Sequence, residues 1–411
     1  MTGIPAIADH EAALTRCLRE LPTYVVLRNE EDLFGNLQRG GDIDLLVADL
    51  DRAERILIRH LGAPIRIIRS SYVSGYSYDW GHVDLLPTLE WRGACYLRTE
   101  AVLESRRLSP RGRPVPAIAH EALVSWFSSL LWGGFFKARY AAEIRHAVEV
   151  DGSAFRQTLT EVAGKKLGLR LWQAAVDGHA EVSAEWTRSL RRAVWWRACR
   201  SSPVRTIQRF VAFVIGELKL RFHPAVPWIA IVGPDGNGTS SLVNEIVHRF
   251  AACPYGNVKT IHWRSCHTVR AHGNEPVTDS HERPSGGPIG SSWRLLVLAA
   301  DWLGCYWARW AHLRAKGCIL ALDHTYFDVV VDRTQNANGA VSRLGRVLMW
   351  LLPKPDLVFV LNSEPNVDEI QRAIRAWMSH RSVATLGGEA PSVSAPTLNA
   401  VGSSHAPGEP R

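Results

Sequence analysis

The segment "VPWIAIVGPDGNGTSSLVNEIVHRF" (residues 226–250) constrains the fold more than any other part of the chain. Residues 228–232 predict a buried strand, the glycine-rich run predicts a tight turn, and residues 240–250 have the spacing of an amphipathic helix. Further helices are predicted at 293–315, 345–352 and 367–378, and further strands at 317–322 and 356–361. Strands that are apolar throughout indicate a parallel sheet with helices on both faces, and hence an α/β fold.

The turn in this segment has the spacing of a nucleotide phosphate-binding loop, or P-loop. The consensus is G-x-x-x-x-G-K-[ST], and this chain carries threonine at the lysine position. Glycines let backbone N–H groups point at phosphate oxygens, the helix adds the positive end of its dipole, and the final hydroxyl commonly holds Mg²⁺. A tight turn with incidental glycines is the alternative. The expected nucleotide-binding residues are Gly233, Gly236, Asn237, Gly238, Thr239, Ser240 (also a Mg²⁺ ligand) and Ser241, and the expected cofactors are ATP and Mg²⁺.

Three segments of this region resemble the thymidylate kinase family. "GPDGNGTSSL" is similar to the family's loop, "LALDHTYFDVVVD" to its strand with a following Asp-Arg-Tyr element, and "LLPKPDLVFVLNSEP" to a later strand. The resemblance implies that Asp235 is the loop carboxylate and that Asp323 helps order Mg²⁺ and substrate. His324 stands where the family has arginine, and no arginine-rich lid motif follows. The implied activity is a kinase-like phosphoryl transfer to a nucleotide or related small molecule, attenuated by the missing lysine.

An acidic pattern marks the N-terminal region. "RGGDIDLLV" places Asp42 and Asp44 two residues apart on a predicted strand (42–47), so both side chains lie on one face, and a later strand carries Asp84. Three such carboxylates can hold two Mg²⁺ ions for a nucleotidyl transfer. The pattern resembles the nucleotidyltransferase fold, although Arg28-Asn29 occupies the distance where that fold has G-[GS]. The resemblance implies a catalytic, metal-binding role for the three acids, and the alternative is a solvated strand edge.

Composition shifts divide the chain into four predicted zones. Residues 1–116 mix helix and strand signals, with strands at 24–28, 42–47, 65–68 and 82–86, and form the nucleotidyltransferase-like α+β domain. Residues 117–222 are mostly helical. Residues 223–383 form the P-loop domain, and residues 384–411, rich in Ser, Ala, Pro and Gly, are expected to be disordered.

The overall charge favours partners that carry phosphate. Lysine and arginine exceed aspartate and glutamate by eight, and the pI is near 9.3. No basic block marks a nucleic-acid-binding tail, so nucleic acid is not an expected partner. Seven scattered cysteines and no apolar run long enough to cross a bilayer favour a cytoplasmic location.

Two regions suggest further contacts. Residues 204–222 are basic and amphipathic, which allows peripheral membrane contact, although a helix packed between domains is the simpler interpretation. The clusters "RRAVWWRACR" and "WLGCYWARW" combine Trp with Arg and could stack bases or bind anionic lipid, although core packing is the simpler interpretation. The sequence leaves the oligomeric state open, with a homodimer as one option.

Three hypotheses for function follow. The first is an ATP-binding phosphotransferase of the thymidylate kinase type. The second is Mg²⁺-dependent nucleotidyl transfer in the N-terminal domain. The third is a non-catalytic nucleotide-binding scaffold in a polysaccharide or lipid assembly, which the missing P-loop lysine motivates. The combination of domains resembles bacterial proteins found with surface-polysaccharide biosynthesis.

Overall fold

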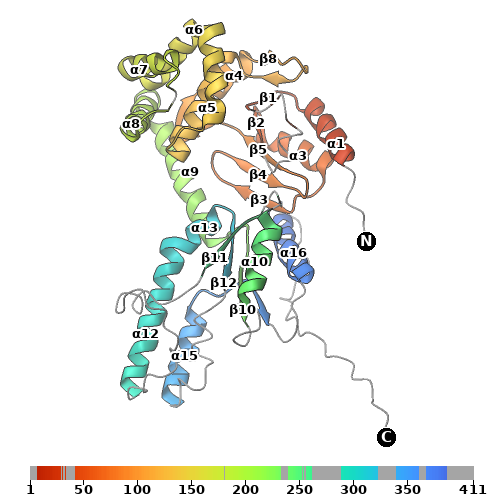
Figure 1. The fold of residues 1–411 in the computed structure, drawn as a ribbon, viewed down its shortest axis with the longest axis vertical. Coiled ribbons are helices and arrows are strands. Elements are labelled where there is room, and N and C mark those ends of the chain that lie inside the picture. The colour runs from red at the N-terminus through yellow and green to blue at the C-terminus, as the bar shows by residue number, and fades with distance from the viewer. Residues whose placement is uncertain are drawn as a thin grey trace. The chain divides into compact units, whose positions relative to one another are not determined.

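A computed structural model describes the chain in two compact units, Met1–Leu220 and Arg221–Arg411 (Figure 1). The fold is α/β, with a mixed sheet and a helical segment in the first unit and a parallel sheet with helices in the second. The residues that the structure describes are 7–28, 30, 33, 42–179, 181–232, 239–251, 253, 256–261, 288–322, 339–360 and 367–386.

The first unit is built on a five-stranded sheet with the order β1-β2-β5-β4-β3. Strand β2 pairs antiparallel with β1 and parallel with β5, while β4 pairs antiparallel with both β5 and β3. Strands β2 and β5 have the predicted bounds, and β1 ends two residues earlier than predicted. The strands are β1 (Tyr24–Val26), β2 (Asp42–Val47), β3 (Arg66–Arg69), β4 (Ser74–Ser77) and β5 (His82–Leu86).

Two helices pack together beside this sheet, α1 (Ile7–Glu20) and α3 (Leu50–Leu61). Helix α3 begins where the Asp49 side chain accepts a hydrogen bond from the backbone N–H of Arg52, at 3.0 Å, which satisfies one of the free amides of the first turn. Because β2 and β5 are parallel, the chain between them must cross over the sheet. That crossover contains α3 and the β3–β4 hairpin.

Short elements connect the sheet to the helices that follow. They are the hairpin of β6 (Leu89–Trp91) and β7 (Ala94–Leu97), helix α4 (Thr99–Glu104), and the hairpin of β8 (Arg107–Leu108) and β9 (Pro114–Val115). The first hairpin turns at Arg92 and Gly93, with φ of 50° and 87°. A Cβ on Gly93 would lie 2.4 Å from the backbone nitrogen of Phe210, so glycine is required for this close approach.

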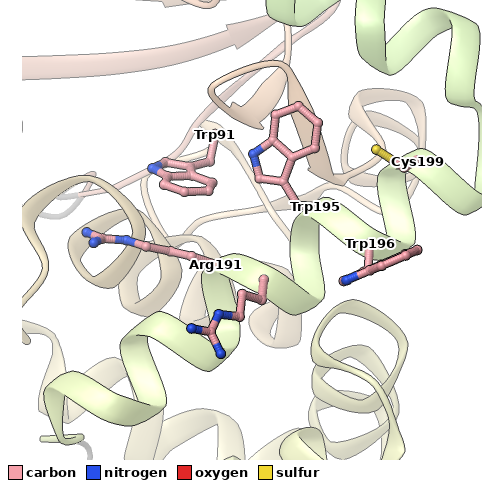
Figure 2. A pocket seen from close by; sticks show the side chains of 6 residues that line it. Trp91, Arg191, Trp195, Trp196 and Cys199 are labelled. Carbon is pink, nitrogen blue, oxygen red and sulfur yellow. The ribbon is translucent and has the colours of Figure 1, made fainter.

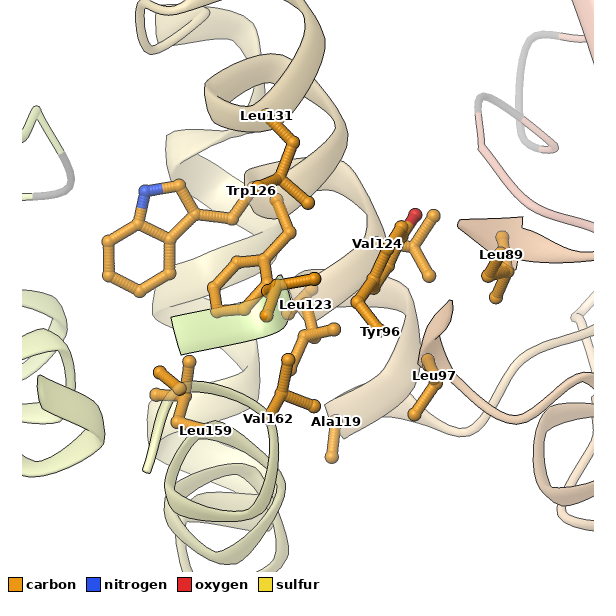
Figure 3. Close-up of a cluster of buried hydrophobic side chains, with 14 of the residues drawn as sticks. Leu89, Tyr96, Leu97, Ala119, Leu123, Val124, Trp126, Leu131, Leu159 and Val162 are labelled. Carbon is orange, nitrogen blue, oxygen red and sulfur yellow. The ribbon is translucent and has the colours of Figure 1, made fainter. Parts of the chain in front are cut away.

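The rest of the first unit is helical, as predicted for residues 117–222. A core forms around α5, α6 and the β6–β7 hairpin, and it includes Leu123, Trp126 and Leu159 (Figure 3). Trp126 and Leu123 are fully buried. The helices are α5 (Ile118–Ser128), a π-helical turn η1 (Ser129–Gly133), a 3₁₀ turn η2 (Ala138–Tyr140), α6 (Ala141–Ala163), α7 (Lys165–Val176), α8 (Ala184–Ser201) and α9 (Pro203–Phe222).

The second unit contains a four-stranded sheet with the order β11-β12-β10-β13, and every pairing is parallel. Strand β10 lies between β12 and β13. Strand β11 was not predicted, because its alternation of polar and apolar residues is weak. The strands are β10 (Trp228–Val232), β11 (Asn257–Ile261), β12 (Cys318–Leu322) and β13 (Leu357–Val360).

Helices of the second unit pair with one another, α10 with α16 and α12 with α15 (Figure 1). Trp302 and Trp310 pack with Trp228 in one core cluster, so core packing is the correct interpretation for these two members of the "WLGCYWARW" cluster. The helices are α10 (Thr239–Ala251), α12 (Pro288–Cys305), a π-helical turn η3 (Tyr306–Trp310), α13 (Ala311–Ala315), α15 (Gly339–Leu351) and α16 (Val367–Thr385). Within the described part of the chain, no helix is both long and apolar enough to cross a bilayer.

Candidate metal centre

Three aspartates of the first unit converge on two neighbouring parallel strands. Asp42 and Asp44 lie two residues apart on β2, and the register places Asp44 directly opposite Asp84 on β5. Each of the three side chains offers a carboxylate oxygen, and these oxygens lie within 4.8 Å of one another. The predicted grouping of the three acids is therefore present in the structure.

The environment of these acids is not a solvated strand edge, so that alternative is wrong. Strand β2 is an interior strand of the sheet, with β1 on one side and β5 on the other. Asp44 is buried, and Asp42 and Asp84 are half-buried. A buried carboxylate is costly unless it is paired or binds a cation, which makes the partners of Asp44 informative.

Arg28 is the partner of Asp44. Its Nε donates to Asp44 Oδ2 at 2.9 Å and its Nη2 forms an ion pair with the same oxygen, while Nη1 donates to Ser128 Oγ at 3.1 Å and to the Tyr140 hydroxyl at 3.2 Å. Burial raises the pKa of Asp44 to about 6; the charge of Arg28 opposes this shift, and the charges of Asp42 and Asp84 reinforce it. Arg28 thus favours the ionised form of Asp44, while burial and the two neighbouring acids disfavour it.

A chain of hydrogen bonds orients Asp84. Arg66 Nε donates to Ser77 Oγ at 3.1 Å, Ser77 Oγ lies 2.8 Å from His82 Nδ1, and His82 Nε2 lies 3.0 Å from Asp84 Oδ1. One neutral tautomer of His82, with the proton on Nε2, satisfies every link of this chain. Partners of this kind fix the position of a metal ligand.

Gly75 makes room for the Asp84 carboxylate. It pairs with Asp84 across β4 and β5, and a Cβ at this position would lie 2.7 Å from Asp84 Oδ1 and 3.0 Å from the His82 ring. Any side chain on residue 75 would therefore displace the carboxylate or the imidazole.

Arg28, His82 and Gly75 are functional candidates that the sequence analysis missed. His82 had a usable signal, because strand alternation places it on the same face as Asp84 by the argument that grouped Asp42 with Asp44. Arg28 was noticed only as a departure from G-[GS]. Gly75 had no signal, since its role depends on a pairing between β4 and β5.

The donor set fits a hard divalent cation. All three groups are carboxylate oxygens, which Mg²⁺ prefers. Oxygens about 2.0–2.1 Å from one ion lie up to roughly 4 Å apart, so side-chain rotation would bring these three, which lie within 4.8 Å of one another, onto one ion. Both bonds from Arg28 go to Oδ2 of Asp44, so Oδ1 is outside that ion pair. Mg²⁺ or Mn²⁺ can thus be accommodated while Arg28 stays in place.

The other predicted site lies mostly outside the described residues. This applies to Gly233, Asp235, Gly236, Asn237 and Gly238, and to Asp323. The elements that flank the loop are present: β10 ends at Val232, and α10 begins with residues 239, 240 and 241. The strand and the helix of the predicted strand–turn–helix order are therefore present at the predicted places.

Comparison of the chain with protein-family models, with curated proteins and with solved structures finds no match. The function must therefore be argued from the chemistry of the sites. The three acids of the first unit give the most complete geometry for that argument.

Proposed function

We propose that the first unit carries out Mg²⁺-dependent nucleotidyl transfer at Asp42, Asp44 and Asp84. The observation that carries this proposal is the convergence of the three carboxylates on adjacent strands, with Asp44 and Asp84 in register. Bound Mg²⁺ would stabilise the attacking and leaving oxygens of the transfer.

The residues around the acids have distinct tasks under this proposal. Arg28 holds Asp44 in place and limits the rise in its pKa, and His82 orients Asp84. Lys137 lies close enough for the charges of Asp42 and Asp44 to affect its pKa, which burial and the charges of Arg139 and Arg28 lower. These basic groups supply the positive charge that a triphosphate requires where the chain lacks G-[GS].

The test follows transfer of label from α-labelled NTP to the protein itself and to a panel of hydroxyl-bearing small molecules, with Mg²⁺ or with chelator. Asp42→Asn and Asp84→Asn should each lower the rate by more than about 100-fold, because even outer-shell partners of a metal cost roughly 10–100-fold. Asp51→Asn is the matched control, since Asp51 is an exposed aspartate in the first turn of α3. Transfer that survives Asp42→Asn and Asp84→Asn would refute the proposal.

A second function, nucleotide binding by the second unit, is supported by the order of its sheet. From β10 the chain continues to β11 and β12 on one side and later to β13 on the other, so β10 is a topological switch point. Ligands of open α/β sheets bind beyond the carboxyl ends of the strands at such points. The predicted P-loop follows β10 directly. Asp323 follows Leu322, the residue of β12 that pairs with Ala230.

Titration of the chain with ATP and ADP in Mg²⁺ tests this second function, and no binding of either would refute it. Thr239→Lys restores the charge of the consensus loop. A large gain of turnover on a panel of acceptors would identify an attenuated phosphotransferase of the thymidylate kinase type. Binding without turnover in both forms would instead support a non-catalytic nucleotide-binding role.

A further inference from the structure

Helix α9 exposes a continuous apolar stripe on the first unit. The stripe residues recur every three or four positions and all are exposed: they are Val204, Ile207, Val211, Ile215 and Leu218. The opposite face packs on the unit, where Thr206 and Leu220 are buried and the Thr206 hydroxyl donates to the Ala198 carbonyl at 2.9 Å. Packing within the first unit therefore does not explain why the exposed face of α9 is apolar.

The charges beside this stripe are basic. Arg205 and Lys219 are exposed on α9. Glu217 is the one acid in the helix, and it is half-buried near Tyr72. Burial of Tyr72 and the charge of Glu217 both raise the pKa of the Tyr72 hydroxyl. Arg209 already has an acidic partner, because its Nε lies 3.8 Å from Oε2 of the buried Glu90. The solvent side of α9 thus combines apolar side chains with positive charge alone.

A cavity of about 430 Å³ adjoins this helix (Figure 2). The ring of Trp195, which lines the cavity, packs edge-on against Phe210 of α9, with ring centroids 5.3 Å apart. Helix α9 therefore packs against the wall of the cavity. Trp196 is 76% exposed at its mouth. The lining residues are Trp91, Arg191, Arg192, Trp195, Trp196 and Cys199.

Three arginines lie at or beside this mostly apolar cavity, Arg191 and Arg192 in its lining and Arg92 against Trp91. The guanidinium groups of Arg92 and Arg191 lie 5.2 and 5.5 Å from the ring centre of Trp91. Arg191 donates its hydrogen bonds to the backbone carbonyls of Leu130 and Leu131. Among the described residues, no carboxylate pairs with Arg92, Arg191 or Arg192, so an anion would be favoured here.

Indole rings, arginines and an apolar stripe together fit the surface of an anionic bilayer. Tryptophan is enriched at the interface between lipid and water, basic side chains bind lipid phosphates, and an amphipathic basic helix lies in the interface plane. A second copy of the chain would bring like charges of Arg205 and Lys219 together. A nucleic acid would leave the apolar stripe without a partner.

We propose that α8 and α9 form a binding surface for bilayers that contain anionic phospholipid. The stripe of α9 lies in the interface, the mostly apolar cavity between Trp91 and α8 receives part of an acyl chain, and Arg92 and Arg192 beside it lie near the lipid phosphates. The proposal is independent of the chemistry at the three aspartates.

Co-sedimentation of the full chain with vesicles tests this surface. Binding to vesicles of phosphatidylcholine mixed with phosphatidylglycerol should exceed binding to phosphatidylcholine alone by at least about tenfold, since each basic residue near such a surface contributes several-fold. The double substitution Ile215→Gln with Leu218→Gln should weaken binding by at least about tenfold. Arg192→Gln with Lys219→Gln should reduce the preference for the anionic vesicles.

The chain offers a closely matched control. Val150 and Val176 are 59% and 47% exposed, against 58% and 46% for Ile215 and Leu218, and they lie on α6 and α7 of the same unit. Val150→Gln with Val176→Gln should leave vesicle binding unchanged, and far-ultraviolet circular dichroism should report the same helix content for all variants. Equal loss in this control, equal binding to neutral vesicles, or unchanged binding of the stripe variant would overturn the proposal. So would a wild-type dimer that the stripe substitutions convert to a monomer, because a second copy would then cover the stripe.

Discussion

Each unit of the chain contains a buried pair of arginine with aspartate, and the two pairs differ in what surrounds them. In the second unit, Arg314 lies 2.5 Å from Asp356, and Asp356 also accepts from the backbone N–H of Trp228 at 2.8 Å. That pair ties the start of β10 to the residue before β13. In the first unit, Arg28 pairs with Asp44, but two further carboxylates adjoin the pair.

The difference separates a structural pair from a candidate site. Arg314 donates its remaining bonds to the Val226 carbonyl and the Tyr306 hydroxyl, so its charge is matched by one acid and neutral acceptors. Around Asp44, two further carboxylates converge on the pair, Asp42 from the same strand and Asp84 from β5, and together they form a donor set that a cation could bind. Convergence of several carboxylates, rather than burial of an ion pair as such, is therefore the feature that makes the first pair a candidate site.

Removal of Arg314 should have the largest effect on stability. Arg314→Met leaves the half-buried Asp356 without its partner and also removes the hydrogen bonds to Val226 and Tyr306, so it should destabilise the second unit by about 3–5 kcal/mol, with or without Mg²⁺. Calorimetric unfolding of the full chain measures this. Adding Asp356→Asn should restore part of the loss, whereas a loss that Mg²⁺ reverses would contradict a purely structural role.

Removal of Arg28 should cost less and should respond to metal. In chelator, Arg28→Met should destabilise the first unit by roughly 2–3 kcal/mol. Asp44 can take up a proton more readily than Asp356, whose hydrogen bond from the Trp228 N–H favours the ionised form. Millimolar Mg²⁺ or Mn²⁺ should recover most of this stability by supplying the lost positive charge. Unfolding midpoints of Arg28→Met that are identical in chelator and in metal would break the distinction between the two pairs.

The slope of the free energy of unfolding against pH should reverse its sign when metal is added. The pKa of Asp44 stands at about 6 in the folded chain, above the ordinary 3.8, so the folded state binds this proton more tightly than the unfolded state. In chelator, Asp44 should therefore make the free energy of unfolding decrease as pH rises through this window. Metal requires the ionised carboxylate, so Mn²⁺ affinity should weaken by roughly tenfold per unit below pH 6. Urea unfolding between pH 3.8 and about 6 measures how stability changes with pH, and Mn²⁺ titration over the same range measures how affinity changes with pH. Asp44→Asn should make both quantities less dependent on pH.

The smallest expected effect comes from a methyl group. Gly75→Ala should weaken Mn²⁺ binding by roughly 10-fold, because the new Cβ displaces Asp84 or His82 from its position. Gly62→Ala is a poor control, since Gly62 has a positive φ. Gly304→Ala serves instead, because a Cβ there meets open space, and Mn²⁺ binding should be unchanged in that variant.

Strands with strong apolar or alternating patterns were predictable from the sequence. The bounds of β2, β5 and β10 match the predictions, and the grouping of Asp42 with Asp44 follows from alternation along one strand. Strand β4, "SGYS", was missed, because small polar residues indicate a turn when they are read locally. It forms a strand because β3 and β5 provide partners on both sides, a context that propensity does not contain.

Contacts between distant segments were the part that the sequence could not supply. Nothing local to Arg28 indicates that its guanidinium reaches Ser128 and Tyr140, which lie 100 and 112 residues away. The exposure of the stripe on α9 was equally hidden, since an amphipathic pattern is the same for a helix on a core and a helix on a membrane. Such features depend on which surfaces meet, and the order of residues along one element does not determine that.

The parallel pairing of β2 with β5 has a consequence for how the chain reaches its folded state. The two strands that supply the acids are separated by α3 and the β3–β4 hairpin, so the carboxylates come together only after this whole crossover is in place. A slip of one residue in the pairing would send Asp84 to the other side of the sheet. A divalent cation bound by all three acids would therefore act as a ligand of the correctly registered sheet alone, adding stability that grows with the logarithm of its concentration. The affinity for a divalent cation therefore reports whether β2 and β5 have paired in the correct register.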